Sequence, residues 1–117
     1  MKKIYYLNTC TDCRRVIKQL GGMNDFEKQE IKTEPITPAQ LKVISELAGS
    51  YDAVFSRKAV KYRLMNLKEK NLSENEMRDL ILEEYTFLKR PVIIVGSKIF
   101  IGHQSETIEA VEKIVKT

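Results

Sequence analysis

The sequence lacks a long hydrophobic run. No apolar stretch approaches the roughly 18–20 residues that are needed to cross a bilayer. The apolar segment that follows Lys2 and Lys3 is too short for the core of a signal peptide, and no small-residue cleavage site comes after it. We therefore expect a cytoplasmic protein that makes no contact with a membrane.

Cysteine and histidine are also scarce. The 117 residues include two cysteines, Cys10 and Cys13, and one histidine, His103. A structural zinc site takes four ligands from these residue types, so no metal is expected. A structural disulfide is disfavoured in a reducing cytosol. Redox chemistry and coincidence remain as explanations for two cysteines that are three residues apart.

Tryptophan is absent, but the chain is not short of core-forming residues. Five Tyr, four Phe and a hydrophobic fraction of 43% exclude a disordered chain. No repeat, linker or low-complexity segment divides the sequence, and its length suits one hydrophobic core. We predict a single domain over residues 1–117.

The charge of the chain is only moderately unbalanced. Twenty Lys and Arg against 16 Asp and Glu give a net charge of +4. Basic residues gather in three places, interpreted for the most part as solvated helix faces: Arg14, Arg15 and Lys18; Arg57, Lys58, Lys61 and Arg63; Lys89 and Arg90. Because this falls short of a continuous basic stripe, no direct DNA binding is expected.

The spacing of apolar residues predicts the order of the elements. Strands are expected at 3–7, 26–31, 91–95 and 98–101. Helices are expected at 14–20, 37–49 and 59–67, after a capping box at 73–76, and around 108–115. The strand–helix–strand start implies a parallel pair, and the turn Gly96-Ser97 implies an antiparallel hairpin. We predict an α/β fold with a mixed four-stranded sheet and a helical insertion at about 37–88, between strands two and three.

The two cysteines lie where the first strand passes into the first helix, which is the thioredoxin-like arrangement of a C-x-x-C motif. Cys10 falls at the turn and Cys13 in the first helical turn, so unpaired N–H groups and the positive helix end favour a thiolate. Arg14 adds a positive charge four residues after Cys10. We predict Cys10 as the nucleophile and Cys13 as the resolving thiol; the alternative is two inert, buried cysteines.

A proline precedes the third predicted strand. Pro91 can occupy only the first position of a core strand. In thioredoxin-like folds the residue at this point faces the redox cysteine across a cis-proline bond, so we predict that Arg90–Pro91 is cis and that Arg90 lies close to Cys10. The alternative is a trans proline preceded by a solvated arginine.

Four motifs together resemble a known family: Cys10-x-x-Cys13-Arg14, Ser56-Arg57-Lys58, Leu88-Lys89-Arg90-Pro91-Val92-Ile93 and Ile101-Gly102. They are similar to the arsenate reductase-like family of thioredoxin folds, which includes the Spx transcriptional regulators, YffB and small thiol reductases. The resemblance covers essentially the whole chain. It implies that Cys10 attacks arsenate, that Arg57 and Arg90 hold the oxyanion, and that glutathione with glutaredoxin, or thioredoxin, supplies the electrons. Guanidinium groups suit this role because they bind tetrahedral oxyanions in bidentate fashion.

The chain departs from the arsenate reductases at two positions. They carry a third arginine where this chain has His103, which is mostly neutral at pH 7. His103 is thus either an active-site residue or a solvated loop residue. The glutathione-coupled enzymes also lack a cysteine at the position of Cys13, whereas Spx regulators use such a pair as an oxidation switch.

The resemblance therefore leaves two functions open. One is a thiol oxidoreductase acting on a small oxyanion or a thiol substrate. The other is a redox-sensing regulator that binds the RNA polymerase α subunit. The resemblance implies that Gly49 contacts this subunit; the alternative is that Gly49 only ends a predicted helix. The chain ends soon after its last helix, without the longer basic tail of the regulators, and this favours the enzyme.

Overall fold

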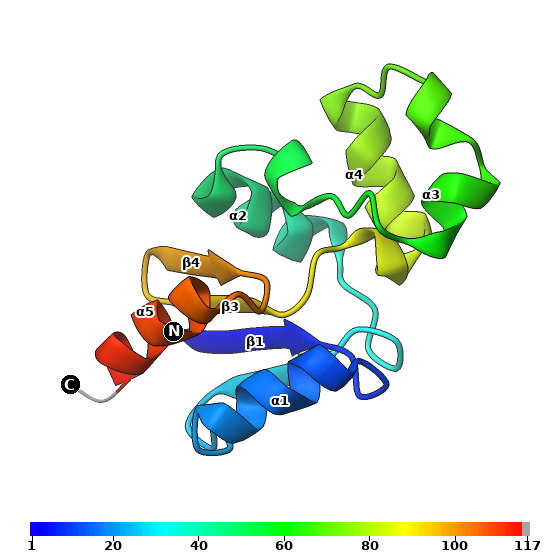
Figure 1. Ribbon diagram of the computed structural model, residues 1–117. Helices are drawn as coiled ribbons and strands as arrows, with labels where there is room; N and C mark the ends of the chain where they lie inside the picture. Colours follow the sequence, from blue (N-terminus) through cyan, green and yellow to red (C-terminus); the bar gives the residue numbers. More distant parts are fainter. Residues whose placement is uncertain (116–117) are drawn as a thin grey trace. The chain divides into compact units, whose positions relative to one another are not determined.

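A computed structural model describes residues 1–115 (Figure 1). The chain forms two compact units: the first joins Met1–Glu34 to the chain from Arg90 onward, and the second is Pro35–Lys89. The second unit corresponds closely to the helical insertion predicted at about 37–88. That the two units make a single domain stays a prediction.

The first unit is built on a mixed four-stranded sheet with the order β2-β1-β3-β4. The strands are β1 (Lys2–Tyr6), β2 (Glu27–Glu30), β3 (Val92–Val95) and β4 (Lys98–Ile101). Strand β1 pairs parallel with β2, with Lys3 opposite Glu27, and antiparallel with β3, with Tyr5 opposite Val92. Strands β3 and β4 form the antiparallel hairpin. The sheet has the strand directions that the sequence predicts.

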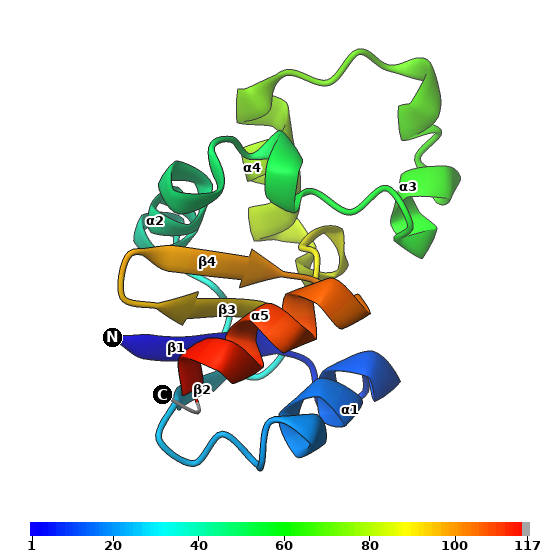
Figure 2. The same ribbon diagram turned by 60° about the vertical axis from the view of Figure 1, so that its left-hand side comes forward.

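Two helices, α1 (Thr11–Gln19) and α5 (Ser105–Val115), pack on one face of this sheet (Figure 2). Their apolar sides meet Ile4 of β1 and Ile93 of β3, and the shared core includes Val16, Leu20, Ile108 and Val111. Because α1 packs along β1 and begins where that strand ends, the loop between them is held at the edge of a rigid core. The cysteine motif lies in this loop and in the first turn of α1.

The second unit is helical. It contains α2 (Pro38–Ala48), α3 (Val60–Leu64), α4 (Glu74–Glu83) and three 3₁₀ helices at Asp52–Val54, Leu67–Glu69 and Tyr85–Phe87. Both predicted capping boxes are present: Gln40 N–H donates to Thr37 Oγ1 at 3.1 Å, and Glu76 N–H donates to Ser73 Oγ at 3.1 Å.

The helix predicted at 59–67 is shorter than expected. It ends at Leu64, and a separate 3₁₀ turn begins at Leu67. Asn66 lies between them in the left-handed conformation, with φ 53°. A residue in this conformation cannot continue a right-handed helix, and asparagine tolerates it better than most residues. None of the helices that the structure describes is long and apolar enough to cross a bilayer.

Candidate functional site

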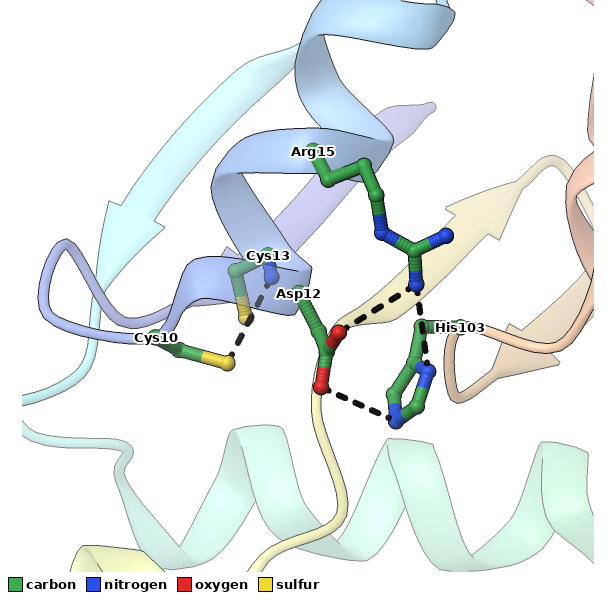
Figure 3. Close-up of polar contacts among 5 residues, drawn as sticks. All are labelled: Cys10, Asp12, Cys13, Arg15 and His103. Carbon is green, nitrogen blue, oxygen red and sulfur yellow. Dashed lines mark hydrogen bonds and ion pairs between the residues drawn. The ribbon is translucent and has the colours of Figure 1, made fainter.

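The loop after β1 places Cys10 at the N-cap of α1 (Figure 3). Its backbone is extended, its N–H donates to the carbonyl of Leu7 at 3.2 Å, and its Sγ accepts the backbone N–H of Cys13 at 3.4 Å. A helix has unpaired N–H groups at its first turn, so a sulfur at this position receives both a hydrogen bond and the positive end of the helix dipole. Cys10 is half-buried and remains open to a reactant.

The pKa of the Cys10 thiol lies below its ordinary value. Burial alone would raise that pKa, but it is outweighed by the backbone and side-chain hydrogen bonds from Cys13 and by the charge and hydrogen bond of Arg90. A thiol with a lowered pKa is present as thiolate, the nucleophilic form, at a lower pH than a free cysteine.

Cys13 has the opposite character. It is fully buried on the inner side of α1, and both cysteines are reduced. Burial is the main cause that raises the pKa of its thiol to about 12, and the neighbouring Cys10 sulfur adds to the rise. Cys13 therefore keeps its proton to a higher pH than Cys10 does.

Arg90, two residues before β3, contributes its charge and a hydrogen bond to Cys10. The Arg90–Pro91 peptide bond is cis, which is the geometry predicted from the sequence. The carbonyl of Pro91 accepts a hydrogen bond from Gly102 N–H at 3.0 Å. This bond ties the loop after β4, which carries His103, to the segment that carries Arg90.

His103 lies against the start of α1 (Figure 3). Its Nε2 is 3.3 Å from Asp12 Oδ2, its Nδ1 is 3.5 Å from Arg15 Nη2, and Arg15 Nη2 is 3.2 Å from Asp12 Oδ1. A guanidinium can only donate, so Nδ1 accepts from Arg15, and the N–H on Nε2 donates a hydrogen bond to Asp12 Oδ2. His103, which the resemblance sets against a third arginine, is thus held by the carboxylate of Asp12, two residues after Cys10.

Arg14 and Arg57 are the other two arginines predicted at the site. Arg14 is exposed on α1. Arg57 belongs to the second unit, where its Nη2 pairs with Asp52 Oδ1 at 2.6 Å and its guanidinium lies 5.6 Å from the ring centre of Phe55. Their roles as electrostatic support for Cys10 and as an oxyanion ligand stay predictions.

Glu30, at the end of β2, is a positioning residue that the sequence analysis missed. Its carboxylate accepts hydrogen bonds from the backbone N–H groups of Asn8, Lys32 and Thr33 at 2.9, 3.0 and 2.9 Å, and from the Thr33 hydroxyl at 3.1 Å. It therefore fastens the loop that leads to Cys10 onto the neighbouring strand. The one feature of the sequence that could have indicated this role was an acidic residue at the end of a strand expected to lie beside β1.

Asp12 and Arg15 were also missed as parts of the site. They are three residues apart on α1, a spacing at which side chains of opposite charge meet, so their pairing could have been predicted. Their contact with His103, 88 residues after Arg15, could not. Across residues 1–115, no three His, Cys, Asp or Glu side chains gather so that they could hold a metal ion.

Known proteins share the sequence pattern and the fold of this chain. The sequence pattern of the ArsC family matches residues 5–111. The chain is 26% identical over 107 residues to the global transcriptional regulator Spx of Lactiplantibacillus plantarum, covering 90% of this chain and 81% of that protein. It is 29% identical over 109 residues to the Bacillus subtilis protein YusI, covering 90% and 92%.

A solved structure shows the same fold. The arsenate reductase from Vibrio cholerae has a TM-score of 0.77 to this chain at 18% identity, over 95% of each chain. The likeness confirms the predicted thioredoxin-like α/β fold class.

Proposed function

The chain belongs to the ArsC family, and on that premise we propose that it is a thiol-dependent oxidoreductase in which Cys10 is the nucleophile and Cys13 the resolving thiol. The observation that carries the proposal is that the pKa values of two neighbouring thiols are shifted in opposite directions. Cys10 caps α1 with a lowered pKa beside Arg90, and Cys13 is buried with a pKa of about 12. An attacking thiolate next to a protected second thiol is the arrangement that two-step exchange requires.

With a disulfide substrate, the Cys10 thiolate attacks one sulfur, and the substrate's S–S bond breaks. One substrate thiol leaves with a proton from solvent, and the other stays bound to Cys10 as a mixed disulfide. Cys13 then loses its proton and attacks the Cys10 sulfur, which releases the second thiol and leaves a Cys10–Cys13 disulfide. Two electrons have passed to the substrate, and glutathione with glutaredoxin, or thioredoxin, returns two to the protein.

A small oxyanion such as arsenate is the other substrate class. Arg90 is already placed to stabilise negative charge at Cys10 and could donate to an oxyanion oxygen. Arg57 would add a second guanidinium in this proposal. His103 in place of a third arginine lowers the fixed positive charge of the site, so we rank disulfides ahead of arsenate.

The nucleophile is tested by the rate of iodoacetamide alkylation against pH, under reducing conditions, for the wild type and for Cys10→Ser. The wild type should show a midpoint below the ordinary cysteine value of about 8.5, and Cys10→Ser should react slowly up to pH 10 because Cys13 is buried. A wild-type midpoint at or above 8.5 would remove the activated thiolate from the proposal.

The substrate is tested by two assays run side by side. One follows arsenate reduction with glutathione and glutaredoxin supplied, and the other follows reduction of a mixed disulfide of glutathione. We expect disulfide turnover that is lost in Cys10→Ser and greatly slowed in Cys13→Ser. Turnover of neither substrate by the wild type contradicts the enzyme.

A second function is favoured by a specific observation, the likeness to the Spx regulator over 90% of this chain. In this alternative the same thiol pair is an oxidation switch on a protein that binds the RNA polymerase α subunit. Gly49 has φ +101° at the end of α2, and an added Cβ would meet open space. The position can therefore be varied without a clash, although any side chain there strains the backbone.

The alternative is tested by pull-down of the carboxy-terminal domain of the polymerase α subunit with the wild type, Gly49→Arg and Gly49→Ala. Alanine brings the same backbone strain without the bulk and charge, so it is the matched control. Binding that survives in Gly49→Ala and is lost in Gly49→Arg would favour the regulator. Absence of binding by the wild type would leave the enzyme as the better proposal.

A further inference from the structure

Helix α3 leaves its apolar side chains in solvent. Val60 is 61% exposed, Leu64 72% and Met65, directly after the helix, 43%, and α3 has no buried residue. Among the described residues, only Met1 and Val43 are other large hydrophobic side chains that are exposed. Three of the five thus lie within six residues. Val60 and Leu64 are one helical turn apart, so they share a face.

The opposite side of α3 is the one that holds it to its own unit. Lys61 Nζ pairs with Glu84 Oε2 at 2.8 Å, and the Tyr62 ring meets the Phe55 ring edge-on at 6.1 Å between centres. Phe55 in turn stacks on Phe87 at 5.3 Å. The helix is therefore anchored by a polar and an aromatic residue, and its aliphatic residues point away. An amphipathic helix that served only its own core would be oriented the other way.

The positive charge of the molecule is concentrated on the same segment. Residues 57–70 hold six of the 20 Lys and Arg and one of the 16 Asp and Glu, so they carry +5, and the other 103 residues together carry −1. Arg57 and Lys61 are paired within the unit. The other four cations of this segment are exposed: Lys58, Arg63, Lys68 and Lys70.

We propose that this α3 surface, comprising Lys58, Val60, Arg63, Leu64, Met65, Lys68 and Lys70, docks an acidic segment of a partner protein that brings its own apolar side chains. The cations attract and orient a negatively charged segment, and burial of the aliphatic side chains supplies the non-polar part of the contact. The proposal is independent of the redox chemistry at Cys10.

Opposite charge borders this surface on one side and gives the contact a direction. A groove of about 210 Å³ is lined by Met65 and Lys70 of this surface and, opposite in charge to the lysine, by Glu76, Asp79 and Glu83. The carboxylates of the partner should therefore lie over the Lys58 and Arg63 side, and apolar side chains should turn towards Met65.

Nucleic acid and an anionic membrane suit the surface less well. Phosphate contacts need cations and polar groups, and the centre of this surface is aliphatic. A membrane-bound helix needs a larger apolar face than the five residues of α3 can offer.

The probe is a fluorescent helical peptide of about 18 residues, long enough to form a helix, with leucines on one face and glutamates elsewhere. Anisotropy should show saturable binding by the full chain that weakens as salt is added. Val60→Ser/Leu64→Ser and Arg63→Glu/Lys68→Glu should each raise the Kd at least about fivefold. Amide shifts in an NMR titration should map to residues 58–70.

Matched controls come from the same unit. Val43→Ser changes an exposed aliphatic residue of α2, and Lys42→Glu changes a charge beside it; both should leave the Kd unchanged. Circular dichroism melting should show all variants folded, because exposed substitutions change stability little.

Several results would overturn the proposal. They are no saturable binding by the wild type, equal affinity for an isomeric peptide with scattered leucines, or unchanged affinity of both α3 variants. Tighter binding to duplex DNA or to phosphatidylglycerol vesicles than to the peptide would replace it with a nucleic-acid or membrane surface.

Discussion

At the scale of single residues, the site depends on a difference in proton affinity between two identical side chains. Cys10 accepts hydrogen bonds at a helix end and faces Arg90, which favours its thiolate. Cys13 is enclosed one turn later, where burial penalises charge. The distinction follows from where each thiol lies in the fold.

Removing the charge of Arg90 should raise the pKa of Cys10. For Arg90→Gln we expect the alkylation midpoint to move up by about one pH unit or more, because an opposite charge within contact distance lowers a pKa by about 1–3 units. Lys18→Gln is the matched control, since Lys18 is an exposed cation in the last turn of α1, away from Cys10. Equal shifts in the two variants would mean that net charge, and not the placement of Arg90, sets the reactivity.

Cys13 should make the protein less stable at high pH. Its pKa is about 12 in the folded chain and about 8.5 in the unfolded chain, so the folded state holds this proton more tightly. The stabilisation is complete below about pH 8.5 and is lost as the pH rises towards 12. Urea unfolding of the reduced wild type and of Cys13→Ala should show a difference in free energy that shrinks above pH 9. A constant difference from pH 8 to 11 would contradict the raised pKa.

At the scale of elements, the end of β2 positions the loop that carries the nucleophile. Burial tends to raise the pKa of the Glu30 carboxyl, but hydrogen bonds from Asn8, Thr33 and Lys32 outweigh it and hold that pKa below its ordinary value. The charged form of Glu30 is therefore the one that organises the turn.

Glu30→Gln should destabilise the protein by about 1 kcal/mol at pH 7, since the lost hydrogen bonds to a charged group are partly exposed to water. A lowered carboxyl pKa stabilises the fold above the unfolded value of about 4.3, and the contribution disappears as the pH falls through the folded value. Unfolding curves of the two proteins should thus converge as the pH falls through the folded pKa of Glu30. A difference that does not shrink between pH 7 and pH 2 would assign the effect to packing instead.

The elements differed in how far the sequence could predict them. Helices α2 and α4 were predictable because Thr37 with Gln40, and Ser73 with Glu76, satisfy the helix N-terminus locally. The 3₁₀ helix Asp52–Val54 was not, because the N–H groups of Tyr51 and Asp52 are held by Glu74, more than 20 residues away. The break after α3 depends on the left-handed Asn66, a conformation that asparagine permits but does not require.

At the scale of the whole molecule, stability should be distributed unevenly. Strands β1 and β3 contribute fully buried residues such as Ile4 and Ile94, whereas α3 buries none. Local opening costs least where few apolar contacts are made, so α3 should be the least protected helix.

Hydrogen exchange can test this directly. We expect the α3 amides to exchange much faster than those of α2, which belongs to the same unit and buries Leu41 and Ile44. The acidic peptide should slow exchange in α3 and leave α2 unchanged. Equal protection of the two helices in the peptide-free protein would contradict the picture of a helix without a core of its own.

Counting charged residues along the sequence predicts only part of the α3 surface. A net charge of +4 suggests a weakly basic protein, and the concentration of charge in residues 57–70 could be counted from the sequence. The outward direction of Val60 and Leu64 could not be predicted from the sequence, because it depends on the contacts that Lys61 and Tyr62 make within the unit. The cysteine site was easier to predict, since a strand, a turn and the start of a helix place both thiols within the first 13 residues.

The cap that Cys10 provides for α1 also couples helix stability to electron transfer. The thiolate accepts the Cys13 N–H and faces the positive end of the helix, and both interactions weaken when the sulfur enters a disulfide. Interactions that favour the reduced form make a dithiol pair a stronger oxidant. Lengthening or fraying the first turn of α1 would therefore adjust the driving force of the reaction, with no change in any residue that touches the substrate.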